Sequence, residues 1–103
     1  MSRDERAYWV YIMASRIGGT LYVGITGDLM SRGAAHRSGE FEGFTKRYGV
    51  TRLVYFEKFD DVNQAIRREK QLKKWKRTWK ISLIEKDNPN WVDLWPGPAV
   101  GSF

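Results

Sequence analysis

Two short runs rich in aromatic and β-branched residues, joined by a glycine-containing turn, constrain the fold of this chain more than any other feature. Residues 8–13 read YWVYIM and residues 20–25 read TLYVGI, so each is predicted to be a β-strand. Between them, residues 15–19 (SRIGG) contain glycines that can adopt positive φ, which favours a tight connection. The two strands are therefore predicted to form an antiparallel hairpin.

The alternation of side chains along these strands limits the register of the hairpin. We predict that Tyr11 lies opposite Tyr22, because this register gathers the aliphatic side chains on one face and both tyrosines with Gly24 on the other. A shift of one residue would place Tyr11 opposite Leu21 and mix the two kinds of side chain. Most tyrosine pairs across strands simply pack together, so the pair alone does not indicate a site.

The next part of the chain is predicted to be a helix, a loop and a third strand. The helix begins with Thr26 or Asp28 as its N-cap and ends at Gly39. Residues 40–50 are predicted to form a loop, and residues 51–59 (TRLVYFEKF) a strand.

A second helical pattern begins after Asp60 or Asp61, either of which is a suitable N-cap. If this helix continued, Lys76 would enter the apolar stripe, so we predict a break near residues 76–78 and another helix over residues 78–86. The order β-β-α-β-α-α predicts a small domain of the α+β class with a short antiparallel sheet. The stripe of the earlier helix consists of Val62, Ala65, Ile66, Leu72 and Trp75.

The length and composition indicate one domain of 103 residues, with a core over about residues 7–86 and a tail over residues 87–103. Trp91, Leu94 and Trp95 are expected to fix the tail to the body. The absence of cysteine and the single histidine exclude disulfides, zinc ribbons, thiol nucleophiles and sites with several histidines. No secretory signal or membrane-spanning run is recognised, so we expect a soluble, cytoplasmic protein without a membrane partner.

The positive charge is concentrated in one stretch. The chain has 18 Lys+Arg against 12 Asp+Glu, and residues 67–80 contain eight cations and one acid. Such a stretch favours nucleic acid, although a solvated helix face is an equally good explanation of the pattern. Trp75 and Trp79 lie within it and are expected to be mainly core residues, with stacking on unpaired bases as the lesser alternative. The candidate nucleic-acid-binding residues are Arg67, Arg68, Lys70, Lys73, Lys74, Lys76 and Arg77.

The helix after the hairpin carries further candidates on one face. Leu29, Arg32 and His36 are spaced i, i+3, i+7 and share that face. If Leu29 packs on the sheet, the arginine and the histidine are carried towards the tyrosines. A surface arginine and an ordinary hydrogen-bonded histidine are the alternatives.

Glu69 falls inside the apolar stripe of its helix, between Ile66 and Leu72. A carboxylate in such a position needs a partner, because an isolated buried charge is very costly. A salt bridge to an arginine and a hard divalent cation such as Mg²⁺, held by one carboxylate and waters, fit the pattern equally well.

An ordered set of motifs gives the chain a resemblance to a known family. It resembles the GIY-YIG nuclease superfamily, and in particular the small stand-alone bacterial members of the URI or UPF0213 type. The resemblance covers nearly the whole chain. The matching segments are VYI at 10–12, YVG at 22–24, TGDLMSRGAAH at 26–36, RREKQLKKW at 67–75, LVYFE in the third strand and NPNWVDL in the tail.

The resemblance implies a small three-stranded antiparallel sheet flanked by helices. It also implies a phosphodiesterase site that uses one metal ion, Mg²⁺ or Mn²⁺. By position, Glu69 matches the metal-binding glutamate, and a late asparagine matches Asn88 or, alternatively, Asn90. The chain departs from the family pattern at Trp9, which stands where the family has a small residue. It also has Gly33, which adds flexibility to the helix that bears Arg32 and His36. The implied catalytic residues are Tyr11, Tyr22, Arg32, His36 and Asn88.

The resemblance therefore implies an endonuclease acting on nucleic acid, DNA in preference to RNA, with a function in DNA repair or processing. A nucleic-acid-binding module that does not cut is the alternative on the same fold. A protein that uses its tryptophan-rich tail for interactions is a third. The sequence leaves the substrate, protein partners and oligomeric state open.

Overall fold

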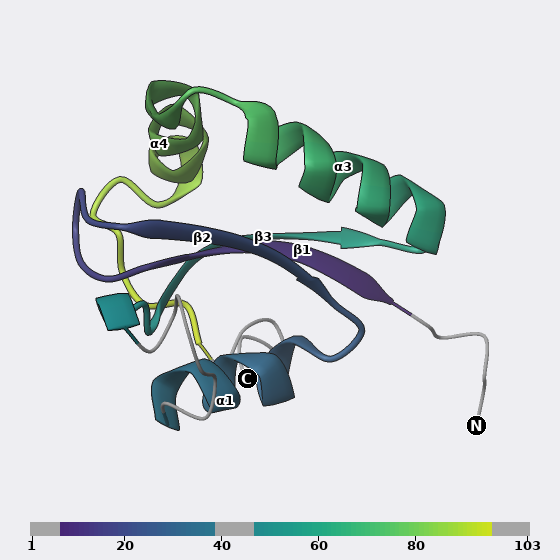
Figure 1. The fold of residues 1–103 in the computed structure, drawn as a ribbon, viewed down its shortest axis with the longest axis horizontal. Coiled ribbons are helices and arrows are strands. Elements are labelled where there is room, and N and C mark those ends of the chain that lie inside the picture. The colour runs from purple at the N-terminus through teal and green to yellow at the C-terminus, as the bar shows by residue number, and fades with distance from the viewer. Residues whose placement is uncertain (1–6, 39–46, 96–103) are drawn as a thin grey trace.

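The computed structural model describes residues 7–38 and 47–95 (Figure 1). In helix α1 the side chains of Gly33 and of residues 36–38 are outside the description. The predicted order of strands and helices is confirmed. The elements are β1 (Tyr8–Ala14), β2 (Leu21–Thr26), α1 (Leu29–Ser38), β3 (Arg52–Phe59), α3 (Val62–Lys74) and α4 (Arg77–Asp87).

The three strands form one antiparallel sheet in the order β2-β1-β3. Helix α1 covers one face, and α3 and α4 lie over the other (Figure 1). The predicted α+β architecture is thus confirmed, with β1 as the central strand. None of the described helices combines the length and the apolar character needed to cross a bilayer.

Both faces of β1 are covered, so consecutive residues of this strand are buried. Val10 and Ile12 point into an aliphatic core, where they meet Leu72 of α3 and Ile84 of α4. Tyr11 and its neighbours on the same face belong to a second, more aromatic core beneath α1, which also contains Met13, Leu29, Val50 and Leu53.

The hairpin register differs from the predicted one by two residues. Tyr11 pairs with Gly24, and Tyr22 pairs with Met13. The predicted register would need a two-residue turn with positive φ at Arg16, whereas the observed turn places its positive φ, 69°, at Gly18. Because the shift is an even number, the predicted sharing of faces is retained.

The predicted break between the last two helices is confirmed. Trp75 is the C-cap of α3 and Lys76 is the N-cap of α4, and both have extended backbone conformations. The change of direction leaves the Trp79 side chain 52% exposed, so the expectation of a core role for Trp79 was wrong; Trp75 is half-buried.

The tail is attached to the body as predicted. Trp91 is buried, and the Leu94 amide donates to the Leu53 carbonyl at 2.7 Å. The indole N–H of Trp95 donates to the Met30 carbonyl of α1 at 3.2 Å. The predicted tail continues into residues 96–103, which lie outside the described residues.

Candidate active site

The Tyr11 side chain crosses the backbone of its neighbour in the edge strand. Tyr11 is 2% exposed and lies opposite Gly24 of β2. A Cβ atom at Gly24 would lie 2.5 Å from both Cζ and Oη of the tyrosine, so any other residue type there would force the phenol to move. Gly24 therefore allows the phenol to reach over β2, the outer strand on this side of the sheet.

Tyr22 is a half-buried diagonal neighbour of Tyr11 on the same face. The two ring centroids are 6.3 Å apart, with the ring planes inclined at 45°. Diagonal neighbours in antiparallel pairs are close enough for aromatic side chains to meet. The two phenols are therefore neighbours as expected, in a register different from the one predicted.

The N-terminal turn of α1 holds Arg32 beside these strands. Asp28 is the N-cap, as one of the two predictions had it: its Oδ1 accepts from the Ser31 amide at 3.1 Å, and its backbone carbonyl accepts from the Arg32 amide at 3.0 Å. The Ser31 bonds also hold the pKa of Asp28 below its usual value. Leu29 is buried against the sheet, and Arg32 lines a hollow of 230 Å³ with Thr26.

Three further residues, Tyr22, Arg32 and Glu69, affect the pKa of the Tyr11 phenol. Burial raises the pKa of the Tyr11 phenol, and the neighbouring Tyr22 and the charge of Glu69 raise it further, whereas Arg32 lowers it. Glu69 comes from α3 and Arg32 from α1, so groups from both faces of the sheet act on one phenol. Among the predicted residues, Tyr22 is thus a ring neighbour of Tyr11, and Arg32 and Glu69 act on the Tyr11 phenol through their charges.

In the part of the chain that the structure describes, Glu69 is paired with a lysine and not with an arginine. Its side chain is 12% exposed, and its Oε2 lies 2.6 Å from the Lys73 Nζ one helical turn later. Lys73 is 55% exposed, so solvent screens its half of the pair. The predicted need for a partner is met by an ion pair whose cation is more than half exposed.

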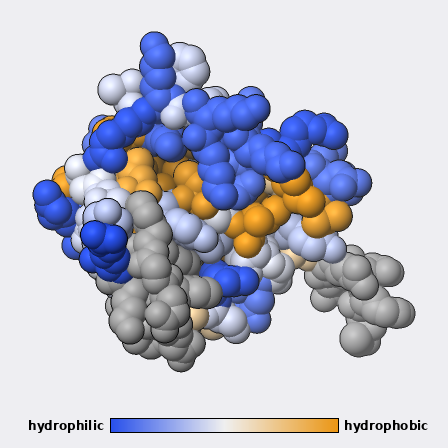
Figure 2. All heavy atoms as spheres, in the orientation of Figure 1, coloured by the Kyte–Doolittle hydropathy of each residue, from blue (hydrophilic) through white to orange (hydrophobic). Residues whose placement is uncertain are grey.

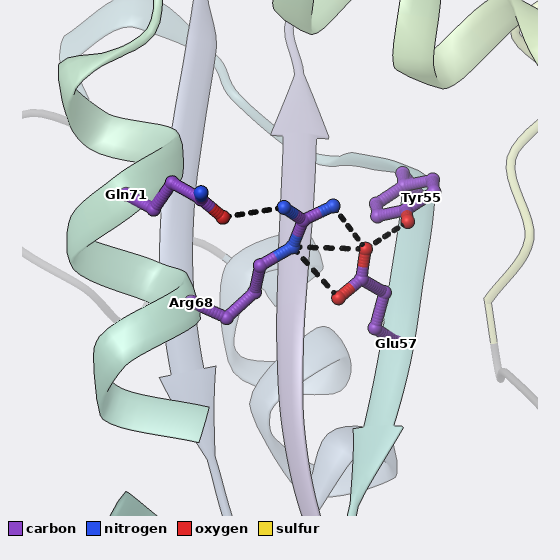
Figure 3. A network of polar contacts seen from close by, with 4 residues as sticks. All are labelled: Tyr55, Glu57, Arg68 and Gln71. Atoms are coloured by element: carbon purple, nitrogen blue, oxygen red, sulfur yellow. Dashed lines mark hydrogen bonds and ion pairs between the residues drawn. The ribbon is translucent and has the colours of Figure 1, made fainter. Parts of the chain in front are cut away.

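The arginine beside Glu69 belongs to a separate network that the sequence did not predict (Figure 3). Arg68 reaches from α3 across the central strand to β3, where its Nη2 lies 2.8 Å and its Nε 3.0 Å from the Glu57 carboxylate. The Tyr55 hydroxyl donates to the same carboxylate. Burial, followed by the hydrogen bond to Glu57, raises the pKa of Tyr55, and the same carboxylate raises that of Arg68.

A sequence signal for this network exists in β3. Tyr55, Glu57 and Phe59 alternate onto one face, and their aromatic members pack against the core beneath α3. A carboxylate between two such residues needs a cation from the covering helix. Because consecutive helical residues project about 100° apart, Arg68 serves this carboxylate while Glu69 points elsewhere.

Two of the predicted catalytic residues are not brought to the site by the described contacts. The side chain of His36 lies outside the described residues. Asn88 is buried at the end of α4, where its amide donates to the carbonyls of Val54 at 3.1 Å and Val92 at 2.9 Å and accepts from the Val92 amide. These bonds use both amide protons to hold the tail, so we leave Asn88 out of the proposed site. The alternative, Asn90, is exposed.

The predicted nucleic-acid-binding cations divide into two groups. Arg68 is committed to Glu57, Lys73 contacts Glu69, and Arg77 donates to the carbonyls of Gly18 and Gly19 at 2.7 and 2.6 Å. Hydrophilic side chains gather over α3 in Figure 2. Arg67, Lys70, Lys74 and Lys76 are exposed, and within residues 7–38 and 47–95 none of them shows an ion pair or carbonyl contact of this kind.

The donor atoms are suited to a metal ion that keeps most of its waters. Across residues 7–38 and 47–95, no three histidine or carboxylate side chains converge on one point. Glu69 is a carboxylate whose charge acts on the Tyr11 phenol. A set of one carboxylate fits Mg²⁺, which is commonly held by one or two carboxylates, water and substrate phosphate.

Comparison with known proteins settles the family. The model of the GIY-YIG catalytic domain matches residues 7–82, which include Tyr11, Arg32 and Glu69. The chain belongs to the GIY-YIG family. Trp9, which departs from the family pattern, packs edge-to-face on Phe56 with ring centroids 5.8 Å apart, so its bulk lies in the aromatic core.

The similar GIY-YIG proteins include several of the UPF0213 type. A UPF0213 protein of Staphylococcus saprophyticus is 34% identical over 77 residues, which cover 75% of this chain and 93% of that protein. One from Clostridium perfringens is 38% identical over 76 residues, covering 74% and 81%. The solution structure of a UPF0213 protein from Bacillus halodurans matches with a TM-score of 0.53 and 29% identity over 84% of this chain and 92% of that one.

Proposed function

We propose that the chain is a divalent-cation-dependent endonuclease that hydrolyses phosphodiester bonds of nucleic acid, with DNA preferred to RNA. The observation that carries the proposal is that an arginine of α1 and a glutamate of α3 both act through their charges on the buried Tyr11 phenol. The match to a catalytic domain of nuclease type supports the same reaction class. DNA repair or processing is the process that we propose for it.

Arg32 and Tyr22 are assigned to the phosphate. The guanidinium presents forked N–H donors that fit phosphate oxygens and stabilise the charge that develops on them. Arg32 is half-buried beside a hollow, so its field is less screened than that of a surface arginine. Tyr22 places a second hydroxyl next to Tyr11, suited to hydrogen-bond the phosphate or the attacking water.

Tyr11 is assigned to the water. Because burial raises its pKa above the ordinary value near 10, the phenol is protonated at neutral pH in this state. To act as a general base it must lose that proton, and Arg32 already favours the loss. Neutralising the Glu69 charge would remove one of the causes that raise the pKa. His36 is proposed to orient Tyr11 or to carry its proton.

Glu69 is assigned to the metal ion, Mg²⁺ or Mn²⁺. Such an ion, when bound, supplies Lewis-acid stabilisation of the phosphoryl group and of the departing oxygen. Glu69 would exchange the Lys73 ammonium for the cation, and Lys73 would then join the exposed cations of α3 along the nucleic-acid backbone.

The test compares wild type with Tyr11→Phe and Glu69→Ala on single- and double-stranded DNA and RNA, with Mg²⁺ or Mn²⁺. We expect cleavage by wild type and a loss of at least about 100-fold in both variants, with binding retained. Tyr8→Phe, on the same strand, is the matched control and should cleave like wild type. Binding without cleavage by wild type would instead support the non-catalytic module.

A further inference from the structure

The junction between α3 and α4 carries an open apolar groove that the proposed hydrolysis does not use. Its volume is 400 Å³, within the range of about 300–1,000 Å³ that is common for small-ligand sites. Trp79, a large indole, is 52% exposed at this groove. The lining residues are Trp75, Trp79, Ser82, Leu83 and Lys86.

The groove owes its shape to the break between the helices. The extended backbone at Trp75 and Lys76 turns the chain, and the indoles of Trp75 and Trp79 meet edge-to-face with centroids 5.9 Å apart and planes at 85°. The Arg68 guanidinium lies 5.2 Å from the Trp75 ring centroid, and Arg68 is itself held by Glu57. The Arg68 guanidinium therefore holds the Trp75 ring in place, and the Trp75 ring in turn packs against the exposed indole of Trp79.

The charges around the groove favour an anionic occupant. The Lys76 Nζ lies 5.7 Å from the centroid of the Trp79 ring, and Lys86 belongs to the lining. The nearby carboxylate of Glu85 accepts a hydrogen bond from the Trp91 indole at 2.7 Å, so it is engaged with the tail. An exposed indole bordered by lysines matches the two parts of a nucleotide, the flat base and the phosphate.

We propose that this groove is a subsite for an unpaired nucleobase, which stacks on Trp79 while Lys76 and Lys86 contact the flanking phosphates. The inference rests on the proposed function and narrows its substrate class to single strands or substrates with an unpaired segment. Glu69 lies five residues before the last residue of α3, which corresponds to about 8 Å along the helix axis. The two sites are therefore close enough along α3 to be served by one strand.

The experiment measures binding of an oligothymidylate of about 12 nucleotides and of a duplex of the same length, at low salt and without divalent cation. We expect Trp79→Ala to weaken binding of the single strand about 5- to 150-fold, with duplex binding changed by less than about 2-fold. Trp79→Phe, which keeps a ring, should bind within about 3-fold of wild type. Val92→Ala, which truncates another exposed apolar side chain, is the control and should bind like wild type.

Lys86→Glu provides an independent variant in case Trp79→Ala is poorly folded by circular dichroism, and it should also weaken single-strand binding selectively. Unchanged or non-selective effects in these variants would overturn the subsite. Self-association of wild type that is lost in Trp79→Ala, measured by sedimentation, would overturn it in favour of an interface between copies.

The outcomes separate the subsite from the proposed function. Cleavage that depends on Glu69 but is indifferent to Trp79 would overturn the subsite and leave the nuclease assignment intact. Single-strand binding that depends on Trp79, in a wild-type protein that never cleaves, would support the subsite and refute the nuclease assignment.

Discussion

The structure contains two groups of the same three residue types, a tyrosine, a glutamate and an arginine, and they differ in how the carboxylate is held. In the first group, Glu57 contacts both the Tyr55 hydroxyl and the Arg68 guanidinium (Figure 3). The side chains of this glutamate and arginine are about one-fifth exposed, so their pair is partly shielded from water.

The second group consists of Tyr11, Arg32 and Glu69. Here the carboxylate contacts Lys73, a cation that is more than half exposed, and acts on the phenol through its charge. In both groups burial is the main cause that raises the pKa of the tyrosine. The two groups contain the same residue types, so residue types alone do not distinguish a structural cluster from a candidate site. What distinguishes them is how exposed the cation is that pairs with the carboxylate.

The largest expected contrast is in cleavage by two matched variants. Glu69→Gln should lower the cleavage rate by about 10³-fold, because the amide removes the charge proposed to hold the metal. Glu57→Gln should remain within about 3-fold of wild type at a temperature where both variants are folded. Single-turnover assays measure both rates. Equal losses in the two variants would show that the groups are not functionally distinct.

The same variants should show the opposite order in stability. Glu57→Gln should lower the free energy of unfolding by about 1–2 kcal/mol, because Arg68 and Tyr55 lose a charged acceptor that is partly buried. Glu69→Gln should change it by less than about 0.5 kcal/mol, since its partner is a screened lysine. Urea unfolding gives both values. A larger loss in Glu69→Gln would reverse our assignment of the structural pair.

The two tyrosines should make the protein less stable at alkaline pH. Their pKa values are raised in the folded state, so above the unfolded value near 10 the unfolded chain binds fewer protons, and stability falls as the pH rises towards the folded values. Each tyrosine contributes up to about 1.4 kcal/mol per pH unit to this decline. Tyr55→Phe and Tyr11→Phe should each flatten it in unfolding curves measured at successive pH values. Curves parallel to wild type would argue against the raised pKa values.

The smallest expected effect concerns the exchangeable partner of Glu69. Lys73→Ala should strengthen Mn²⁺ binding about 2-fold in the absence of nucleic acid, because the ion no longer competes with an exposed i,i+4 ion pair. Isothermal titration calorimetry measures the change, with Lys74→Ala as the control. Weaker Mn²⁺ binding in Lys73→Ala would contradict the competition.

Local patterns predicted the elements well because the relevant interactions are short in sequence. The cap at Asp28 and the break at Lys76 both follow from residues within one or two helical turns. The register of the hairpin could not be predicted in the same way. Alternation distinguishes odd shifts from even ones, so a shift of two residues leaves the face of Tyr11 unchanged, and only the turn conformation at Gly18 selects the register.

The parts of the candidate site that were not predicted depend on long-range placement. Arg68 forms an ion pair with Glu57, whereas Glu69 pairs with Lys73. This choice of partners depends on the position of α3 over the sheet, which the helical pattern does not specify. Likewise, the pattern indicated a break at Lys76 but not the direction of the next helix, and this direction decides that Trp79 faces solvent.

The contact of Arg77 with the hairpin has a mechanical consequence. Its guanidinium holds the carbonyls of Gly18 and Gly19, so the start of α4 is tied to the tip of the loop that leads directly into β2. A force applied to α4 by a bound polymer would be transmitted to the strand that bears Tyr22 and Gly24. Arg77 therefore couples the surface of α4 to the edge strand β2, although the two are far apart in the sequence.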